Sequence, residues 1–191
     1  MLSQPVGSEA LSLGRGQSCD RATEQPSAYY PDMRLAWFSP MPPVATGIAR
    51  CSADLLAVLG NDHAMDVFVD EANIAGAPAL NPRPRSAHDF VWEHRRRPYD
   101  LIVYQLGNSS HHDYQWPYLF RYPGLAVLHD AHLHHARASC LLRTKRVDHY
   151  RDEFRANHPD ADSSLAELAI AGFDNHLHYA SPMTRLVIGD A

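Results

Sequence analysis

Short runs of consecutive apolar residues, each ended by proline, glycine or a polar side chain, are the feature that most constrains how this chain can fold. The runs cover Arg34–Phe38, Ala64–Val69, Asp100–Leu106 and Leu125–His129. Stretches such as Leu101–Tyr104 and Leu125–Leu128 do not alternate with polar residues, which is typical of strands covered on both faces of a sheet. The sequence therefore predicts an α/β domain with a Rossmann-like parallel sheet and helices on both faces.

Helical patterns follow these strands. Apolar residues recur at three- and four-residue spacing from Ile48 to Leu59, and Gly60 is placed to end that helix. The segment Tyr114–Tyr122 predicts a short aromatic helix. One apolar stripe runs from His132 to Arg155, so we expect a single long amphipathic helix there. Between the second and third runs, Asp89–Trp92 predicts one weak strand.

The remainder of the chain is also expected to be helical. Ser164 and Glu167 have the spacing of a capping box, which predicts a helix over Leu165–Ala171. Ser181 followed by Pro182 is typical of a helix start and predicts a last helix.

Length and composition place the ordered part in one domain. The chain has 191 residues, of which 45% are hydrophobic, enough for a single core. Residues 1–32 are rich in Ser, Gly, Gln and Pro without a period, so we expect a disordered tail before a domain over residues 33–191. Three scattered cysteines, no signal peptide and no long apolar run favour the cytoplasm.

Charge argues against nucleic acid as a partner. The net charge is −5 and the isoelectric point is about 6.2, so no basic field is available for binding phosphate backbones. The only basic run, Arg95 to Arg97, is expected to be a solvated turn before a strand.

In an open parallel sheet, ligands bind beyond the carboxyl ends of the strands. Four segments follow the predicted strands: residues 39–47, 70–71, 107–112 and 129–132. In the first, Thr46 and Gly47 open a helix, where free backbone N–H groups favour a phosphate or sugar oxygen. Alternatively, Gly47 only permits a tight turn and Thr46 only caps the helix. No Gly-x-Gly-x-x-Gly motif or P-loop occurs, so a dinucleotide cofactor is not predicted.

Histidines provide a second signal. Six of the thirteen lie between residues 111 and 135, and His132 and His135 would share one helix face. Imidazoles with a carboxylate suit zinc or iron, but the order H-D-x-H-x-H-H matches no zinc motif. We therefore expect no bound metal and a neutral, hydrogen-bonding set that lines a sugar pocket. The aromatic residues Trp116, Tyr118 and Phe120 would either stack on sugars or face the core.

Three motifs add to these indications of a ligand site. They occur in the order and spacing that a known family shows. They are S-P-M-P-P-V-A-T-G-I-A from Ser39, Y-Q-L-G-N-S-S-H-H from Tyr104 and Y-P-G-L-A-V-L-H-D from Tyr122. From about Met33 to Ile188, the chain resembles the amino-terminal, acceptor-side half of a family 4 glycosyltransferase with the GT-B fold.

The resemblance implies transfer of a sugar from a nucleotide-sugar donor to a saccharide or lipid acceptor. It implies that Gly47 approaches the donor phosphate, that Asn108 and His112 line the cleft, and that His129 with Asp130 contacts the transferred sugar or the acceptor hydroxyl. No cofactor is implied, because the nucleotide sugar is a substrate. Some relatives act at a membrane surface, so peripheral membrane contact is compatible with the resemblance.

The family's donor domain carries two glutamates separated by seven residues, and no such pair occurs in this sequence. We therefore expect the chain alone to be inactive and a separate polypeptide to supply the donor domain. Two alternatives stay open: a histidine-rich, metal-dependent hydrolase and a non-catalytic, sugar-binding remnant.

Overall fold

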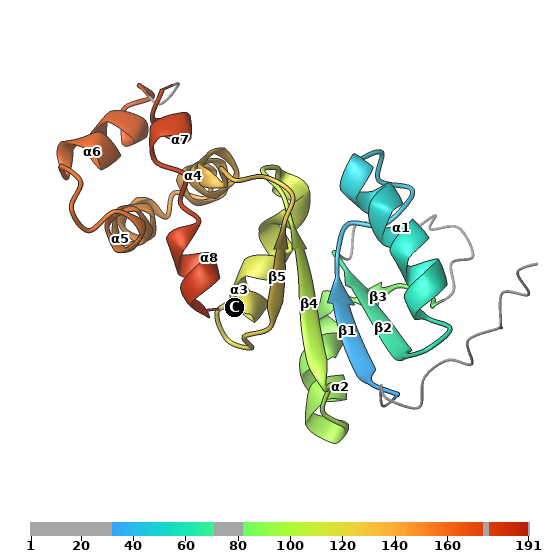
Figure 1. The fold of residues 1–191 in the computed structure, drawn as a ribbon. Helices are drawn as coiled ribbons and strands as arrows, with labels where there is room; N and C mark the ends of the chain where they lie inside the picture. Colours follow the sequence, from blue (N-terminus) through green and yellow to red (C-terminus); the bar gives the residue numbers. More distant parts are fainter. Residues whose placement is uncertain (1–31, 71–81, 174–175, 191) are drawn as a thin grey trace, which may run out of the picture. The chain divides into compact units, whose positions relative to one another are not determined.

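The five strands of the computed structural model form one all-parallel sheet (Figure 1). The structure describes residues 32–70, 82–173 and 176–190, so the predicted tail lies outside it except for Asp32. The strands are β1 (Arg34–Phe38), β2 (Ala64–Val69), β3 (Arg85–Ser86), β4 (Leu101–Leu106) and β5 (Leu125–Leu128), in the order β3-β2-β1-β4-β5. The predicted α/β fold and the four apolar strands are confirmed.

Alternate residues of β1, β2, β4 and β5 pack their side chains into two separate clusters. On one face, Trp37 of β1 and Val103 of β4 pack with Leu56 of α1 (Gly47–Leu59). On the other face, Phe38 and its neighbours pack against α2 (Phe90–Arg96) and α3 (Trp116–Leu119). Both faces are therefore covered, as the uninterrupted apolar runs predict.

The last third of the described chain is helical. It contains α4 (His134–Arg143), α5 (Val147–Asn157), α6 (Ser164–Ile170), α7 (Leu177–Ala180) and α8 (Arg185–Asp190). The first four of these helices bury a cluster of their own, with Leu141, Tyr150 and Phe154 at its centre, whereas Val187 of α8 is buried in the cluster of the sheet.

The predicted single helix from His132 to Arg155 is wrong, because α4 and α5 are separated by a turn. Lys145 adopts a φ of 59°, in the left-handed region that ends a helix. The hydroxyl of Thr144 donates to the carbonyl of Cys140 at 2.7 Å, which satisfies an acceptor at the end of α4. Both helices face the same core, so one apolar stripe crosses the turn.

The predicted weak strand over Asp89–Trp92 is also wrong. A 3-10 turn at Ala87–Asp89 leads directly into α2. Phe90 is fully buried whereas Trp92 is 68% exposed, although residues two apart would share a face in a strand. Arg95 and Arg96 lie in the last turn of α2, so only the residues after them form the predicted turn before β4.

Two predicted helix starts are displaced. Ser163, not Ser164, precedes α6, and its side chain makes no capping bond; instead Asp162 accepts from the backbone N–H of Ser164 at 2.9 Å. Ser181 ends α7 rather than starting α8, and the carbonyl of Pro182 accepts from the backbone of Leu133 at 2.8 Å. A local bond from Asp162 therefore replaces the predicted capping box, and a tertiary contact with Leu133 uses Pro182 in place of a helix start.

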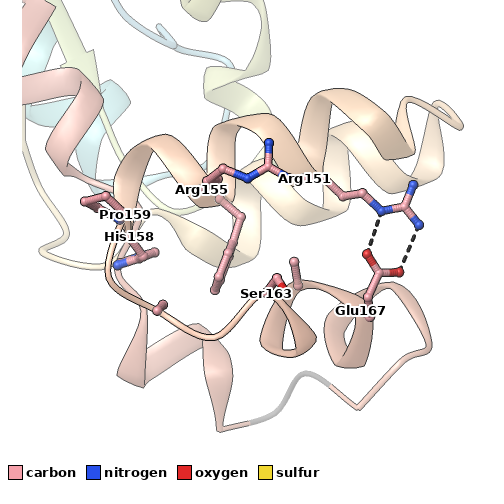
Figure 2. A pocket seen from close by; sticks show the side chains of 9 residues that line it. Arg151, Arg155, His158, Pro159, Ser163 and Glu167 are labelled. Carbon is pink, nitrogen blue, oxygen red and sulfur yellow. Dashed lines mark hydrogen bonds and ion pairs between the residues drawn. The ribbon is translucent and has the colours of Figure 1, made fainter.

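A small pocket of about 160 Å³ lies between α5 and α6 (Figure 2). Arg151 and Glu167 at its rim form a two-bond ion pair, with nitrogen–oxygen distances of 2.6 and 2.9 Å. Arg155 is paired with Asp152 at 3.3 Å. Because both arginines of this pocket already have carboxylate partners, it offers little to an anionic ligand.

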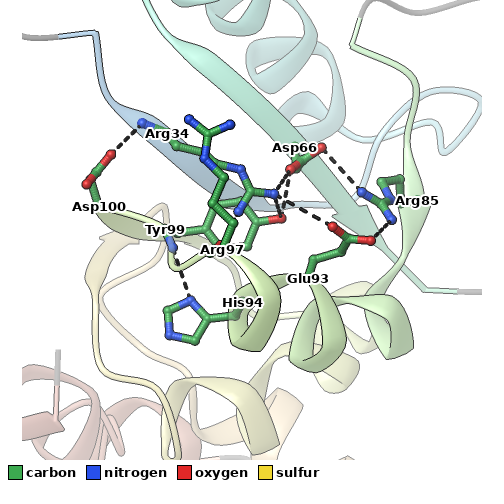
Figure 3. A network of polar contacts seen from close by, with 8 residues as sticks. All are labelled: Arg34, Asp66, Arg85, Glu93, His94, Arg97, Tyr99 and Asp100. Carbon is green, nitrogen blue, oxygen red and sulfur yellow. Dashed lines mark hydrogen bonds and ion pairs between the residues drawn. The ribbon is translucent and has the colours of Figure 1, made fainter.

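A network of charged side chains ties β1, β2 and α2 together (Figure 3). The guanidinium of Arg34 lies 2.6 Å from Asp66 and 3.0 Å from the hydroxyl of Tyr99, which in turn donates to Asp66 at 2.8 Å. Arg85 pairs with Glu93 at 2.7 Å beside them. The Arg34 side chain is only 12% exposed, so removing Asp66 would leave a nearly buried charge with only the more distant carboxylate of Glu93, at 3.8 Å, as its ionic partner.

We expect Asp66→Asn to lower the free energy of unfolding by about 1.5–3 kcal/mol, because hydrogen bonds to a charged group are lost in a half-buried site. Urea unfolding measures the change. The matched control is Asp152→Asn, which breaks an exposed pair and should cost less than about 0.5 kcal/mol. Equal losses in the two variants would contradict the importance of the network.

Candidate functional site

The carboxyl ends of β4 and β5 bring together most of the residues that the sequence singles out. Gly107 and Asn108 directly follow β4, and His129 and Asp130 directly follow β5. The two strands pair in parallel, with Leu106 opposite Leu128, so the four residues emerge side by side at one edge of the sheet. We call this group of residues, together with Gln105 and His112, the sheet-edge site.

Gln105, which is not among the predicted site residues, holds the sheet-edge site together. It is 1% exposed, and its side-chain oxygen lies 2.7 Å from Nε2 of His129. Its backbone carbonyl accepts from Nδ1 of His112 at 2.9 Å and from the side-chain amide of Gln115 at 3.0 Å. One residue of β4 therefore orients both imidazoles. The signal in the sequence is a lone amide inside an apolar run, since buried polar groups are retained only when they are hydrogen-bonded.

These bonds fix where the protons lie on the two rings. A carbonyl oxygen only accepts, so His112 donates from Nδ1 and keeps a lone pair on Nε2. Burial lowers the pKa of His112 to about 4, so its ring is neutral at pH 7. By the same reasoning His129 donates from Nε2 to Gln105, and its Nδ1 is the atom that can accept a proton.

Gly107 allows side chains from three other segments to pack closely against the backbone that follows β4. A Cβ atom at this position would lie 2.5 Å from Cδ1 of Ile48 and 2.9 Å from Nε2 of His112, with Asp130 at 3.5 Å. Real Cβ atoms do not approach other atoms so closely, so only glycine fits here without a shift of its neighbours. The contact with Ile48 also places the start of α1 beside the sheet-edge site.

Asn108 connects this edge to α4. Its backbone N–H donates to Asp130 at 2.9 Å, and its side-chain oxygen accepts from the backbone of Ala136 at 2.9 Å. The second bond satisfies a free donor in the first turn of α4. Asp130 and His129 are both exposed, so their remaining polar atoms are accessible to a ligand.

At the start of α1 the structure shows a capping role. Thr46 accepts from the backbone N–H of Ala49 at 3.1 Å, as a helix N-cap does. Gly47 is exposed, and a Cβ there would have no atom within 4 Å. Thr46 therefore caps, whereas the first turn of α1 remains open to solvent at Gly47.

The histidines of the cluster have different environments. His134 is fully buried; Nδ1 lies 3.2 Å from the carbonyl of Leu177 and Nε2 lies 2.7 Å from the hydroxyl of Tyr150. Burial lowers the pKa of His134 to about 4. This ring joins α4, α5 and α7 and is structural. His111, in contrast, is exposed.

Among the aromatic residues, Trp116 lies in the core. It is 3% exposed, and the guanidinium of Arg137 lies 4.3 Å from its ring centre. Tyr118 packs on Phe38 with ring centres 5.2 Å apart. Of the three predicted stacking residues, only Phe120 is exposed, at 38%.

A second hollow, which we call the histidine pocket, lies next to Asn108. It has a volume of about 360 Å³, and its lining residues are Asn108, His132, His135, His178 and Tyr179. His132 lies before α4, so it does not share a helix face with His135 as predicted, although both residues line this pocket. Within residues 32–70, 82–173 and 176–190, no three His, Cys, Asp or Glu side chains are grouped as metal ligands.

No helix in the described part of the chain is long and apolar enough to cross a membrane. Comparisons with known proteins find no matching family model, no similar curated sequence and no similar solved structure.

We expect Gly107→Ala to lower the free energy of unfolding by about 1–3 kcal/mol, because the added methyl group displaces Ile48 and His112. Chemical shifts of the His112 ring should move as well. Gly47→Ala is the control: its methyl group meets open space, so the free energy should stay unchanged or rise by up to about 1 kcal/mol. A tolerated alanine at 107 would show that the close approach is not needed.

The buried imidazoles also make stability depend on pH. The pKa values of His112 and His134 are near 4 in the folded protein, against a usual value of 6.5, so the unfolded chain takes up protons first. Their contribution is fully present above about pH 6.5 and is lost as the pH falls toward 4. The loss is at most about 1.4 kcal/mol per pH unit for each ring.

Urea unfolding between pH 7 and pH 4.5 measures this dependence. In His112→Gln we expect a shallower fall of the free energy of unfolding with falling pH. His149→Gln, at an exposed position of α5, serves as the matched control. An unchanged slope in the His112 variant would exclude this imidazole as the source.

Proposed function

We propose that the described domain is the acceptor-side half of a nucleotide-sugar-dependent glycosyltransferase of the retaining type, and that His129 and Asp130 meet the acceptor hydroxyl. The observation that carries the proposal is the pairing of His129 with the buried Gln105, next to a carboxylate bound by the backbone of Asn108. A fixed imidazole and a fixed carboxylate at the carboxyl edge of a parallel sheet suit the hydroxyl groups of a sugar.

The chemistry assigns a task to each side chain. In glycosyl transfer the acceptor oxygen bonds to the anomeric carbon, the bond from that carbon to the diphosphate oxygen breaks, and the proton of the acceptor hydroxyl passes to the departing diphosphate. His129 donates from Nε2 to Gln105, so its Nδ1 would accept a hydrogen bond from that hydroxyl. Asp130, with an exposed carboxylate, would orient a neighbouring hydroxyl.

The nucleotide-sugar donor would bind at the start of α1, which lies beside the sheet-edge site. The exposed first turn of α1 at Gly47 presents backbone N–H groups and the positive end of the helix dipole, which favour the oxygens of a nucleoside diphosphate. Further groups on a donor domain would complete the stabilisation of the leaving diphosphate.

The alternative of a metal-dependent hydrolase has less support from the geometry. Both nitrogens of His134 are used in internal contacts, and His112 and His129 each bond to Gln105. Elemental analysis of untagged protein tests this alternative, since a stoichiometric transition metal would favour it.

Saccharide binding tests the proposal on the chain as it exists. Titration of ¹⁵N-labelled protein with glucose, mannose, galactose and N-acetylglucosamine should shift the amide signals of Asn108, His129 and Asp130 with at least one of these sugars. We expect Asp130→Asn and His129→Gln to weaken that binding about tenfold or more, because each removes a hydrogen bond that the sugar would make.

His149→Gln, at an exposed site on a different helix, should leave the affinity unchanged. Saccharide shifts confined to other parts of the protein, or equal affinity in all three variants, would contradict the proposed acceptor site. Binding without transfer when a donor domain is supplied would favour the sugar-binding remnant instead.

A further inference from the structure

The histidine pocket has an unusual lining for its size. Three of its five lining side chains are imidazoles, which come from the loop after β5, from α4 and from α7, and none is a carboxylate or a guanidinium. An amide and a phenol complete the wall. All five lining side chains can donate hydrogen bonds, and an imidazole that takes up a proton also carries a positive charge.

Two of these imidazoles, those of His135 and His178, face each other through their Nδ1 atoms. Nδ1 of His135 lies 3.4 Å from Nδ1 of His178, and the ring centres are 5.0 Å apart. When both rings are neutral, one proton can lie between the two nitrogens. When both are charged, two N–H groups and two like charges meet, which is unfavourable unless one acceptor bonds to both N–H groups.

We propose that the histidine pocket binds an oxyanion, the phosphate or sulfate group of a small molecule, with His135 and His178 as its donors. Because the two nitrogens are 3.4 Å apart, an anionic oxygen beside the pair, within hydrogen-bond distance of both, can accept from both Nδ1–H groups and offset both charges. The pocket lies at the start of α4, where the helix dipole adds to the attraction. This inference does not depend on glycosyl transfer.

The volume of the pocket indicates a ligand larger than a bare ion. A volume of about 360 Å³ lies within the range of small-molecule sites and far exceeds one phosphate group. Asn108 and the 75% exposed ring of Tyr179 are suited to a polar, ring-shaped remainder of the ligand. The class of ligand is therefore a phosphorylated small molecule such as a sugar phosphate.

The other titratable and charged groups on the elements around the pocket do not replace the imidazoles. They include His129 and Asp130 in the loop after β5, His134, Arg137 and Arg143 on α4, Glu153 on α5, His158 after α5 and His176 before α7. Asp130 is bonded to the backbone of Asn108, and Arg137 is paired with Glu153. His134 is buried behind His178, with ring centres 4.8 Å apart, and burial holds its pKa near 4.

Sulfate is the first probe, because its charge does not change between pH 6 and pH 8. Titration followed by the imidazole signals of ¹⁵N-labelled protein should show binding at His135 and His178 that is about tenfold or more tighter at pH 6.0 than at pH 8.0. Proton uptake on binding produces this dependence. Affinity that is equal at the two pH values would overturn the proposal.

Variants locate the site. His135→Gln, at an exposed position, and His178→Gln should each weaken sulfate binding about tenfold or more and flatten its pH dependence, because a donor and a charge are lost. His149→Gln is the matched control and should bind as the unaltered chain does. The amide spectrum verifies the fold of each variant. Unchanged binding in a folded His135→Gln variant would overturn the assignment of the site.

Further ligands separate the chemical class from other occupants. Glucose 1-phosphate should bind at least as tightly as inorganic phosphate, whereas glucose alone should not perturb these rings. Shifts of His135 and His178 by glucose alone would overturn the oxyanion as the recognised group and would still fit the proposed acceptor site. Stoichiometric zinc binding through the same two rings, without sulfate binding, would also overturn the proposal.

Discussion

The hydrogen bonds of Gln105 are the interaction on which the sheet-edge site depends. A polar side chain in the middle of an apolar strand is costly to bury unless its groups are bonded. Gln105 meets this condition by accepting from His129 through its side chain and from His112 through its backbone. The same bonds that satisfy the buried residue select one tautomer for each ring. The hydrogen bonds that satisfy Gln105 in β4 therefore also position the two imidazoles of the sheet-edge site.

The strands could be predicted from the sequence because the burial of a strand determines the residue types within that short segment alone. Arg34–Phe38 and Ala64–Val69 have the predicted bounds, since a strand covered on both faces shows an unbroken apolar run. The break between α4 and α5 could not be predicted in this way. The apolar stripe continues across Lys145, and only the left-handed backbone at that residue separates the two helices. Periodicity reports which residues face the core, not whether one helix or two presents them.

The candidate site was predictable in outline for a different reason. Parallel strands end at a common edge, so the order of the strands alone places Asn108 and His129 near each other. The contribution of each histidine could not be predicted. His134 and His135 are neighbours in the sequence, yet one is fully buried between helices and the other is exposed in a pocket. Their environments depend on partners about forty residues away in α7, which no local pattern records.

Asn108 makes the sheet-edge site and the histidine pocket neighbours with a shared wall. Its backbone N–H holds the carboxylate of Asp130 on one side, and its side chain holds the first turn of α4 and lines the pocket on the other. A fixed anion and a set of protonatable rings thus lie on the two sides of one well-anchored residue. A sugar phosphate that spans Asn108 would place hydroxyl groups near Asp130 and its charge among the imidazoles. In the reverse orientation the phosphate of such a ligand would lie against the carboxylate of Asp130. The repulsion between these two charges would therefore favour one orientation of the ligand.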